Sequence, residues 1–134
     1  MNAKLIFAFR IALASVWLYN GLWLKLIVSD GQHLSIVQSV FTNASVDPLL
    51  VLKLIGSCET LLAIGIMSGL CYRFISIFQI VVIVSMNIAG ILFGGGAIEH
   101  PVGLIVSNLP TIMCALAVAM HGPGWASLAW KKNE

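Results

Sequence analysis

Four long runs of apolar residues dominate the chain, and short polar segments separate them. The runs extend over about Leu5–Val28, Pro48–Leu70, Phe74–Phe93 and Val102–Met120. A helix that crosses the ~30 Å hydrocarbon layer of a bilayer takes about 20 residues, which is close to the length of each run. The pattern predicts an all-α fold: an integral membrane bundle of four transmembrane helices that forms a single domain over residues 1–134.

The residues that flank these runs are typical of helix ends. Asp47-Pro48 predicts the start of the second helix, because Asp accepts hydrogen bonds from free amides of the first turn and Pro suits the first helical position. Gly94-Gly95-Gly96 predicts the end of the third helix. The N-terminus is similar to a signal peptide, but Arg10 interrupts its apolar run and no small-residue cleavage site follows. We expect this segment to remain as the first span.

The only long connection joins the first two spans. Its run HLSIVQSVF, from His33 to Phe41, places Leu34, Val37 and Val40 at helical spacing. The spacing predicts a short amphipathic segment that lies on the outer surface as a lid. An ordinary interfacial loop is the alternative.

The composition of the chain indicates that the protein needs a lipid bilayer around it. Apolar residues make up 60% of the chain and charged residues 9%, and the mean hydropathy is +1.02. A soluble fold of this length cannot hide so much apolar surface. The formal charge of +2 is small and the basic residues are dispersed, so we expect no nucleic-acid partner. Cys58, Cys71 and Cys114 lack metal-ligand spacing, and we interpret them as packing residues with no metal site.

The charges between the spans predict an orientation. One side carries Lys4, Arg73, Lys131 and Lys132, and the other carries Asp30, Asp47, Glu99 and His100. The positive-inside bias then places both termini in the cytoplasm, in a multi-pass protein of the cell membrane. The indoles of Trp125 and Trp130 are expected at the aromatic belt of the inner interface.

Glu59 is the most informative residue, because it lies about eleven residues into the second span, or about 16 Å along the helix. A charge at the centre of a membrane helix costs about 2.5–3.5 kcal/mol even on a lenient scale. Glu59 must therefore face the interior of the bundle, where we expect a catalytic role as a proton relay. The alternative is a protonated carboxyl group that donates to a backbone carbonyl.

Each of the other spans also carries a strongly polar residue. On the predicted topology, these groups and two lysines surround Glu59 in the outer half of the bilayer: Asn20, Lys25, Lys53, Asn87 and Asn108. Together they predict an outward-facing, ligand-binding polar pocket. Two alternatives stay open: the lysines extend to the interface, and the two later asparagines simply form hydrogen bonds between helices.

Two arginines are expected to act as structural charges. Arg10 lies in the inner half of the first span, seven residues before Trp17 and on the same helix face. We expect it either to pair with Glu59 or to reach the inner headgroups. Arg73 belongs to the inner side by its place between the second and third spans.

The segment WLYNGLWLKL, from Trp17 to Leu26, adds aromatic groups to this pocket. Gly21 permits close approach of a helix or a flat ligand, and Lys25 follows one turn later. With Tyr19, the indole of Trp17 can line a slot for a planar amphipathic molecule. An interfacial aromatic belt explains Trp23 well, but Trp17 lies too deep for it.

These residues resemble the DoxX-like family of small four-helix membrane proteins. The matching features are Arg10 ahead of WLYNGLWLKL, Glu59 with the glycines and Arg73 after it, Asn108-Leu109-Pro110, and the closing GPGWASL. The resemblance implies several possible roles, because relatives include membrane subunits of thiosulfate:quinone oxidoreductase, partners of superoxide dismutase and a sulfurtransferase, and assembly factors for receptors. Arg10, Asn20, Lys25 and Glu59 occupy recurrent polar positions of that family.

Three hypotheses follow, and the sequence leaves open whether the chain is an enzyme. The first is a membrane subunit of an oxidoreductase that binds a quinone-like molecule. This subunit would belong to a redox system or to a system that oxidises thiols or sulfur, and its partner would be a redox protein or further copies of itself. The second is a non-enzymatic membrane partner or assembly factor. The third is a small proton-coupled transporter, since such a path also uses a mid-membrane carboxylate.

Overall fold

We analysed a computed structural model of the chain, which describes residues 1–94, 96 and 98–128. These residues form helices and no strand. The elements are α1 (Ala3–Leu18), a π-helix η1 (Tyr19–Ile27), α2 (Gly31–Val40), α3 (Pro48–Ser68), α4 (Tyr72–Phe93) and α5 (Pro101–His121). The all-α prediction is therefore confirmed.

Four helices are long and apolar enough to span a membrane. They are the continuous Ala3–Ile27 helix made of α1 and η1, together with α3, α4 and α5. Each agrees with a predicted run to within about two residues at either end. The orientation of the termini stays a prediction, and three residues used for it or for the aromatic belt lie outside the described residues: Trp130, Lys131 and Lys132.

The ends of α3 and α4 follow the predicted signals. Asp47 is the N-cap of α3 and accepts a hydrogen bond from Leu49 N at 3.0 Å, with Pro48 in the first turn. Helix α3 ends at Gly69, which has a left-handed φ of +68°, and α4 ends with Gly94 as its C-cap. Glycine suits the first of these positions because other residues rarely adopt positive φ.

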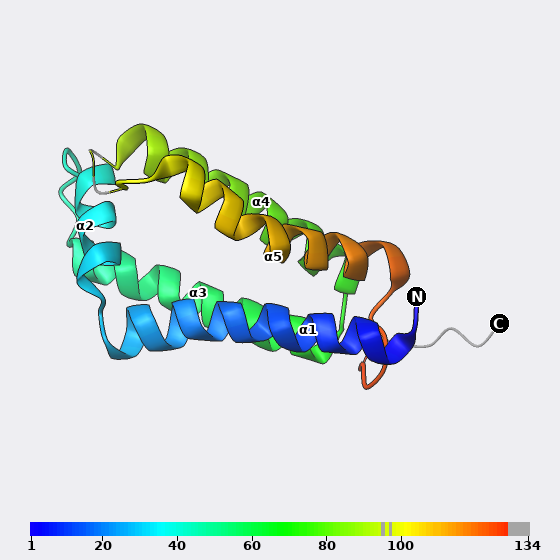
Figure 1. Cartoon of the computed structure of the whole chain (residues 1–134). Helices are drawn as coiled ribbons and strands as arrows, with labels where there is room; N and C mark the ends of the chain where they lie inside the picture. Colours follow the sequence, from blue (N-terminus) through cyan, green and yellow to red (C-terminus); the bar gives the residue numbers. More distant parts are fainter. Residues whose placement is uncertain (95, 97, 129–134) are drawn as a thin grey trace.

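The helices pair in two layers that diverge along the bundle. Helix α1 packs on α3, and α4 packs on α5. Figure 1 shows the α1–α3 pair and the α4–α5 pair close together near the N-terminus and further apart at the other end, where α2 lies between them. We call the wide part, which contains η1, α2 and residues 98–104, the α2 end. The narrow part, which contains residues 2–10, 66–72 and 121–128, is the terminal end.

A segment does form a helix in the connection between the first two spans. Helix α2 covers Gly31–Val40 and contacts both α3 and α4. Its N-cap is Asp30, whose carboxylate accepts a hydrogen bond from His33 N at 3.2 Å. Helix α2 therefore bridges the two layers where they are furthest apart, and its position on a membrane surface stays a prediction.

The apolar core fills the narrower part of the bundle. Its buried members come from α1, α3, α4 and α5: Ile6, Leu13, Ala14, Trp17, Ala63, Ile66, Ile83, Ala115 and Val118. Most other large apolar side chains point outward, as expected for helices surrounded by lipid. Cys58 and Cys71 are also exposed free thiols, so within the chain they are not the packing residues that we expected.

Arg10 organises the terminal end. The side chain is 1% exposed, and it donates to Ile66 O at 2.9 Å and to Met67 O at the last turn of α3. It also donates to Pro123 O at 2.8 Å and to Trp125 O at 3.2 Å in the segment after α5. The cation is well placed, because the C-terminal carbonyls of a helix carry partial negative charge and lack helical partners.

The C-terminal segment closes this end of the bundle. Trp125 N donates to Ala3 O at 3.0 Å, and Leu128 N donates to Ser68 O at 2.7 Å. The indole of Trp125 also meets the Phe7 ring edge to face at 5.4 Å. Arg10 is thus a structural charge that binds backbone carbonyls. The expectation that it pairs with Glu59 or reaches headgroups is wrong, and Arg73 is exposed.

Candidate functional site

The first span changes its helical repeat where it approaches the α2 end. From Tyr19 to Ile27 it is a π-helix, in which each amide bonds the carbonyl five residues earlier. Segments of π-helix are rare in proteins, and those that do occur are often found at functional sites. The wider turn presents Gly21 and Lys25 to α3, and both are buried.

Two glycines let η1 and α3 cross in close contact. A Cβ added to Gly21 would lie 2.7 Å from Gly56 O and 2.7 Å from Glu59 Cβ. A Cβ added to Gly56 would lie 2.7 Å from Lys25 Cβ and 2.9 Å from Gly21 O. The predicted close approach at Gly21 is therefore made by a helix, and it brings Lys25 next to Glu59.

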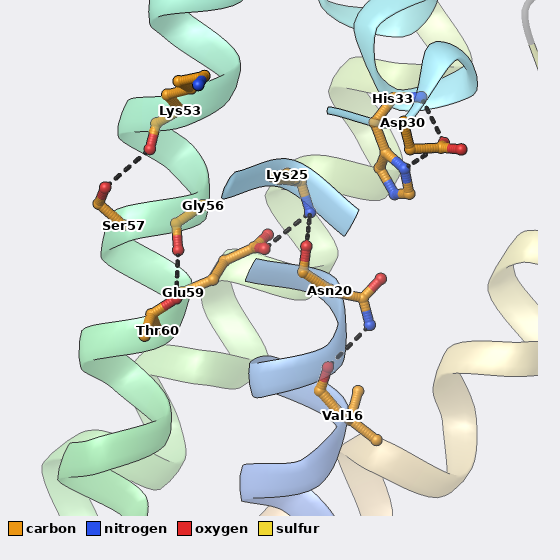
Figure 2. A network of polar contacts seen from close by, with 10 residues as sticks. All are labelled: Val16, Asn20, Lys25, Asp30, His33, Lys53, Gly56, Ser57, Glu59 and Thr60. Carbon is orange, nitrogen blue, oxygen red and sulfur yellow. Dashed lines mark hydrogen bonds and ion pairs between the residues drawn. The ribbon is translucent and has the colours of Figure 1, made fainter. Parts of the chain in front are cut away.

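Lys25 and Glu59 form an ion pair inside the bundle. Lys25 Nζ donates to Glu59 Oε2 at 2.7 Å, and the two side chains are 4% and 5% exposed. The ammonium group also donates to Asn20 O at 3.4 Å (Figure 2). Glu59 thus accepts from a lysine and does not donate to a backbone carbonyl, and Lys25 points inward and not to the interface.

Trp17 is fixed by a residue of the opposite layer. Its indole Nε1 donates to Gln79 Oε1 of α4 at 2.9 Å, and Trp17 is 4% exposed while Gln79 is fully buried. The remaining amide nitrogen of Gln79 has no hydrogen-bond partner among the described residues. Burying an unpaired polar group costs free energy, so this amide is an exception in an otherwise well-satisfied interior.

A pair of amides connects α4 with α5. Asn108 Nδ2 donates to Asn87 Oδ1 at 2.9 Å, as the alternative interpretation of these residues requires. The bond uses one donor and one acceptor, so Asn87 keeps an NH₂ group and Asn108 keeps a carbonyl oxygen. Both residues are half-buried and also face the cavity described next.

A cavity of about 750 Å³ lies between the two layers at the α2 end. Its polar lining includes Asn20, Lys25 and Glu59 on one wall and Asn87, Asn108 and Thr111 on the other. Trp17 and several aliphatic side chains supply the apolar lining: Val16, Ile36, Val37, Leu52, Ile55, Ile83, Met86, Ile98 and Leu104. The size and the mixture of apolar surface with a few polar groups are typical of sites for small molecules.

Titratable residues surround the cavity at the α2 end. His33 of α2, together with Glu99 and His100 before α5, contributes to the lining. His33 Nδ1 lies 2.9 Å from Asp30 Oδ2, and this hydrogen bond holds the pKa of the Asp30 carboxyl below its usual value. The cavity therefore has a charged and titratable rim and a more apolar interior.

The chain was compared with known proteins. The model of the DoxX-like family matches residues 14–116, which includes all four spans in whole or in part. The chain belongs to the DoxX-like family. No curated protein and no solved structure gives a match. Family membership and four membrane-spanning helices together identify this DoxX-like chain as a multi-pass membrane protein.

The structure places most predicted site residues of this DoxX-like protein around one cavity. Six of the eight line it: Trp17, Asn20, Lys25, Glu59, Asn87 and Asn108. Tyr19 is 57% exposed and faces away, because the π-helix turns Gly21 and Lys25 toward α3. Lys53 is also exposed and does not line the cavity. These two residues therefore lie outside the cavity, and their role in ligand binding stays a prediction.

Several residues that line the cavity or hold its lining in place were missed from the sequence. Gln79 does not line the cavity but accepts the hydrogen bond of Trp17. It is a strongly polar residue inside the third span, so the argument applied to Asn87 was equally available for it. Gln32, His33 and Thr111 gave no such signal, because their contribution depends on how α2 and α5 are placed. Among the described residues, no group of three or more His, Cys, Asp or Glu side chains is arranged to hold a metal ion.

Proposed function

We propose that this DoxX-like protein is a membrane subunit that binds a small, planar, lipid-soluble molecule of the quinone type in the cavity. In this proposal it works in a redox or thiol and sulfur-oxidation system of the cell membrane. The electrons pass to or from a redox partner protein. The observation that carries the proposal is the buried Lys25–Glu59 ion pair on the wall of a cavity of about 750 Å³.

The ion pair is poorly explained by stability alone. Burying two charges costs solvation energy that their attraction only partly returns, and well-packed apolar residues often serve equally well. In a membrane span, an ionisable pair is a candidate functional site by default. Here the pair borders empty space and is held by the Gly21–Gly56 crossing, so its polar atoms are available to a ligand.

The cavity offers complementary groups for a ring that carries oxygens. Lys25 Nζ can donate to a carbonyl oxygen, and Asn87 can donate from its free NH₂ group on the opposite wall. The flat indole of Trp17 provides an apolar wall for the ring, and Gln79 fixes its orientation. In the proposal, the Glu59 carboxylate accepts the proton that a ligand oxygen releases on oxidation, and the protonated carboxyl group returns a proton to that oxygen on reduction.

Quinone titration of the purified protein tests the proposal. The probe is a short-chain ubiquinone analogue, and the readout is the quenching of tryptophan fluorescence that disappears in Trp17→Phe. We expect saturable binding to the wild type and about tenfold weaker binding in Lys25→Met, because a charge-assisted hydrogen bond is lost. Glu59→Gln is expected to weaken binding, because the Lys25 ammonium group loses the carboxylate that holds it in place.

Lys53→Met is the matched control, because Lys53 is a lysine of the same bundle that lies outside the cavity. Its affinity should equal that of the wild type. Absence of saturable binding in the wild type, or equal losses in Lys53→Met and Lys25→Met, would count against the proposal.

A further inference from the structure

The four spans meet in four lateral seams, and one of them differs from the others in the half of the bundle that contains the cavity. Helix η1 packs on α3, and α4 packs on α5 along their lengths. Helix α3 also contacts α4, and α2 contacts both and bridges them at the α2 end (Figure 1). Within the described part of the chain, no comparable packing joins η1 to α5.

The seam between the first span and α5 closes only at the terminal end. Helix α1 packs on α5, but the two diverge toward the α2 end, where η1 replaces α1. Figure 1 shows this side in front, with α1 and α5 close together near the N-terminus and separated near α2. The open part of the seam is therefore the flank of the cavity.

Cavity-lining residues form both edges of this seam. Val16 and Asn20 lie on the first span, and Leu104, Asn108 and Thr111 lie on α5. Val16 lines the cavity and is also 41% exposed. From Leu104 to Thr111 the edge is about 10 Å long at the rise of an α-helix. Because both edges belong to helices that are long and apolar enough to span a membrane, we expect the seam to face hydrocarbon.

We propose that the cavity opens sideways into the bilayer through the seam between η1 and α5, and that its ligand is a tailed lipid. The polar ring of the ligand lies between the Lys25–Glu59 pair and the Asn87–Asn108 pair. Its hydrocarbon tail leaves through the seam and stays among the lipid chains. This inference rests on the proposed function and adds the class of ligand and its route.

The proposed route agrees with the chemistry of the cavity rim and of the seam. A tail directed toward the rim would meet His33, Glu99 and His100, and apolar chains are not stabilised there. A tail directed through the seam meets Val16 and Leu104 and then lipid. The ring passes Asn20 and Asn108, whose side-chain amides can form hydrogen bonds with its oxygens.

The test compares a decyl-tailed benzoquinone with the same ring lacking the tail. Both are titrated into the protein in nanodiscs, and affinities are expressed per ligand dissolved in lipid so that partitioning cancels. Val16→Phe narrows the seam, whereas Leu18→Phe is its control, because Leu18 is exposed to a similar degree and does not line the cavity. We expect Val16→Phe to weaken the tailed ligand about tenfold and to change the tail-less ligand less than twofold.

A second variant keeps the test independent of how Val16→Phe folds. Gly103 lines the cavity on α5 and a Cβ there makes only ordinary contact, 3.5 Å from His100 Cβ. Gly103→Phe should reproduce the selective loss, and Val102→Phe, at a lipid-exposed neighbour, should not. Equal effects on both ligands, or none on either, overturn the lateral route while leaving the proposed function in place. Failure of both ligands to bind the wild type overturns both proposals.

Discussion

The two ends of this bundle handle buried charge in opposite ways. At the terminal end, Arg10 has no carboxylate partner among the described residues, and its guanidinium group donates to backbone carbonyls. At the α2 end, Lys25 has a carboxylate partner, and the pair borders a cavity of about 750 Å³. The first arrangement ties three segments together, and the second leaves polar atoms next to open space.

This difference separates a structural charge from a candidate functional one. All three nitrogens of the Arg10 guanidinium group donate to backbone carbonyls, two of which belong to the last turn of α3. This group therefore has little donor capacity left for a ligand. An ammonium with one strong partner and one long contact retains donor capacity. The number of free donor directions, and not the presence of a charge in a span, indicates where a ligand binds.

The largest expected effect comes from breaking the terminal end. Arg10→Met removes charged hydrogen bonds to Ile66 O and Met67 O and to the segment after α5. Hydrogen bonds to charged groups contribute about 1.5–3 kcal/mol each, so the free energy of unfolding should fall by about 3 kcal/mol or more. Detergent unfolding followed by circular dichroism measures it. Arg73→Met, at an exposed site, is the control; an equal fall there would show that Arg10 has no special role.

The next effect comes from separating η1 from α3. Gly21→Ala places a methyl group 2.7 Å from Gly56 O, so the helices must move apart at a cost of about 1–3 kcal/mol. The ion pair lengthens with them, and ligand affinity should fall together with stability. Gly31→Ala is the matched control, since nothing lies within 4 Å of its added Cβ. Unchanged stability in Gly21→Ala would contradict the close crossing.

A smaller effect is expected at the bond between the layers. Gln79→Leu leaves the indole N–H of Trp17 unpaired and should cost about 1–2 kcal/mol. The double variant Trp17→Phe with Gln79→Leu removes both partners and the unpaired amide of Gln79, so its stability should return close to that of the wild type. Additive losses in the double variant would show that the two side chains are not coupled.

The smallest effect concerns the N-terminus of α2. Hydrogen bonds from His33 lower the pKa of Asp30, so the folded state favours the carboxylate. This contribution is present above the ordinary pKa of an aspartate and is lost as the pH falls through the lowered value. Amides of α2 should then exchange hydrogen faster in acid. Asp30→Asn, which keeps a capping oxygen at every pH, should abolish the pH dependence; a dependence that persists would exclude Asp30 as its source.

The spans were predictable because their signal is strong and local. Each needs only length and hydropathy, and the start of α3 was fixed by Asp47 and Pro48. Glu59 was also predictable as an inward-facing residue, since lipid excludes its charge. These inferences require no knowledge of which helices are neighbours.

The features that the sequence could not show depend on tertiary geometry. The partners of Arg10 are main-chain carbonyls, which leave no trace in the residue types. Tyr19 and Lys53 have the polarity and depth of site residues, and only the angular repeat of η1 and the path of α3 show that they face outward. Gln79 is different, because its polarity within a span was a usable signal.

The π-helical segment of the first span decides which way Lys25 faces. A π-helix has more residues per turn than an α-helix, because each amide bonds one residue further back. The same sequence wound as a uniform α-helix, which advances by about 100° per residue, would therefore turn Lys25 away from Glu59. A comparison of DoxX-like relatives should ask whether this wide turn is kept as well as whether the lysine is present.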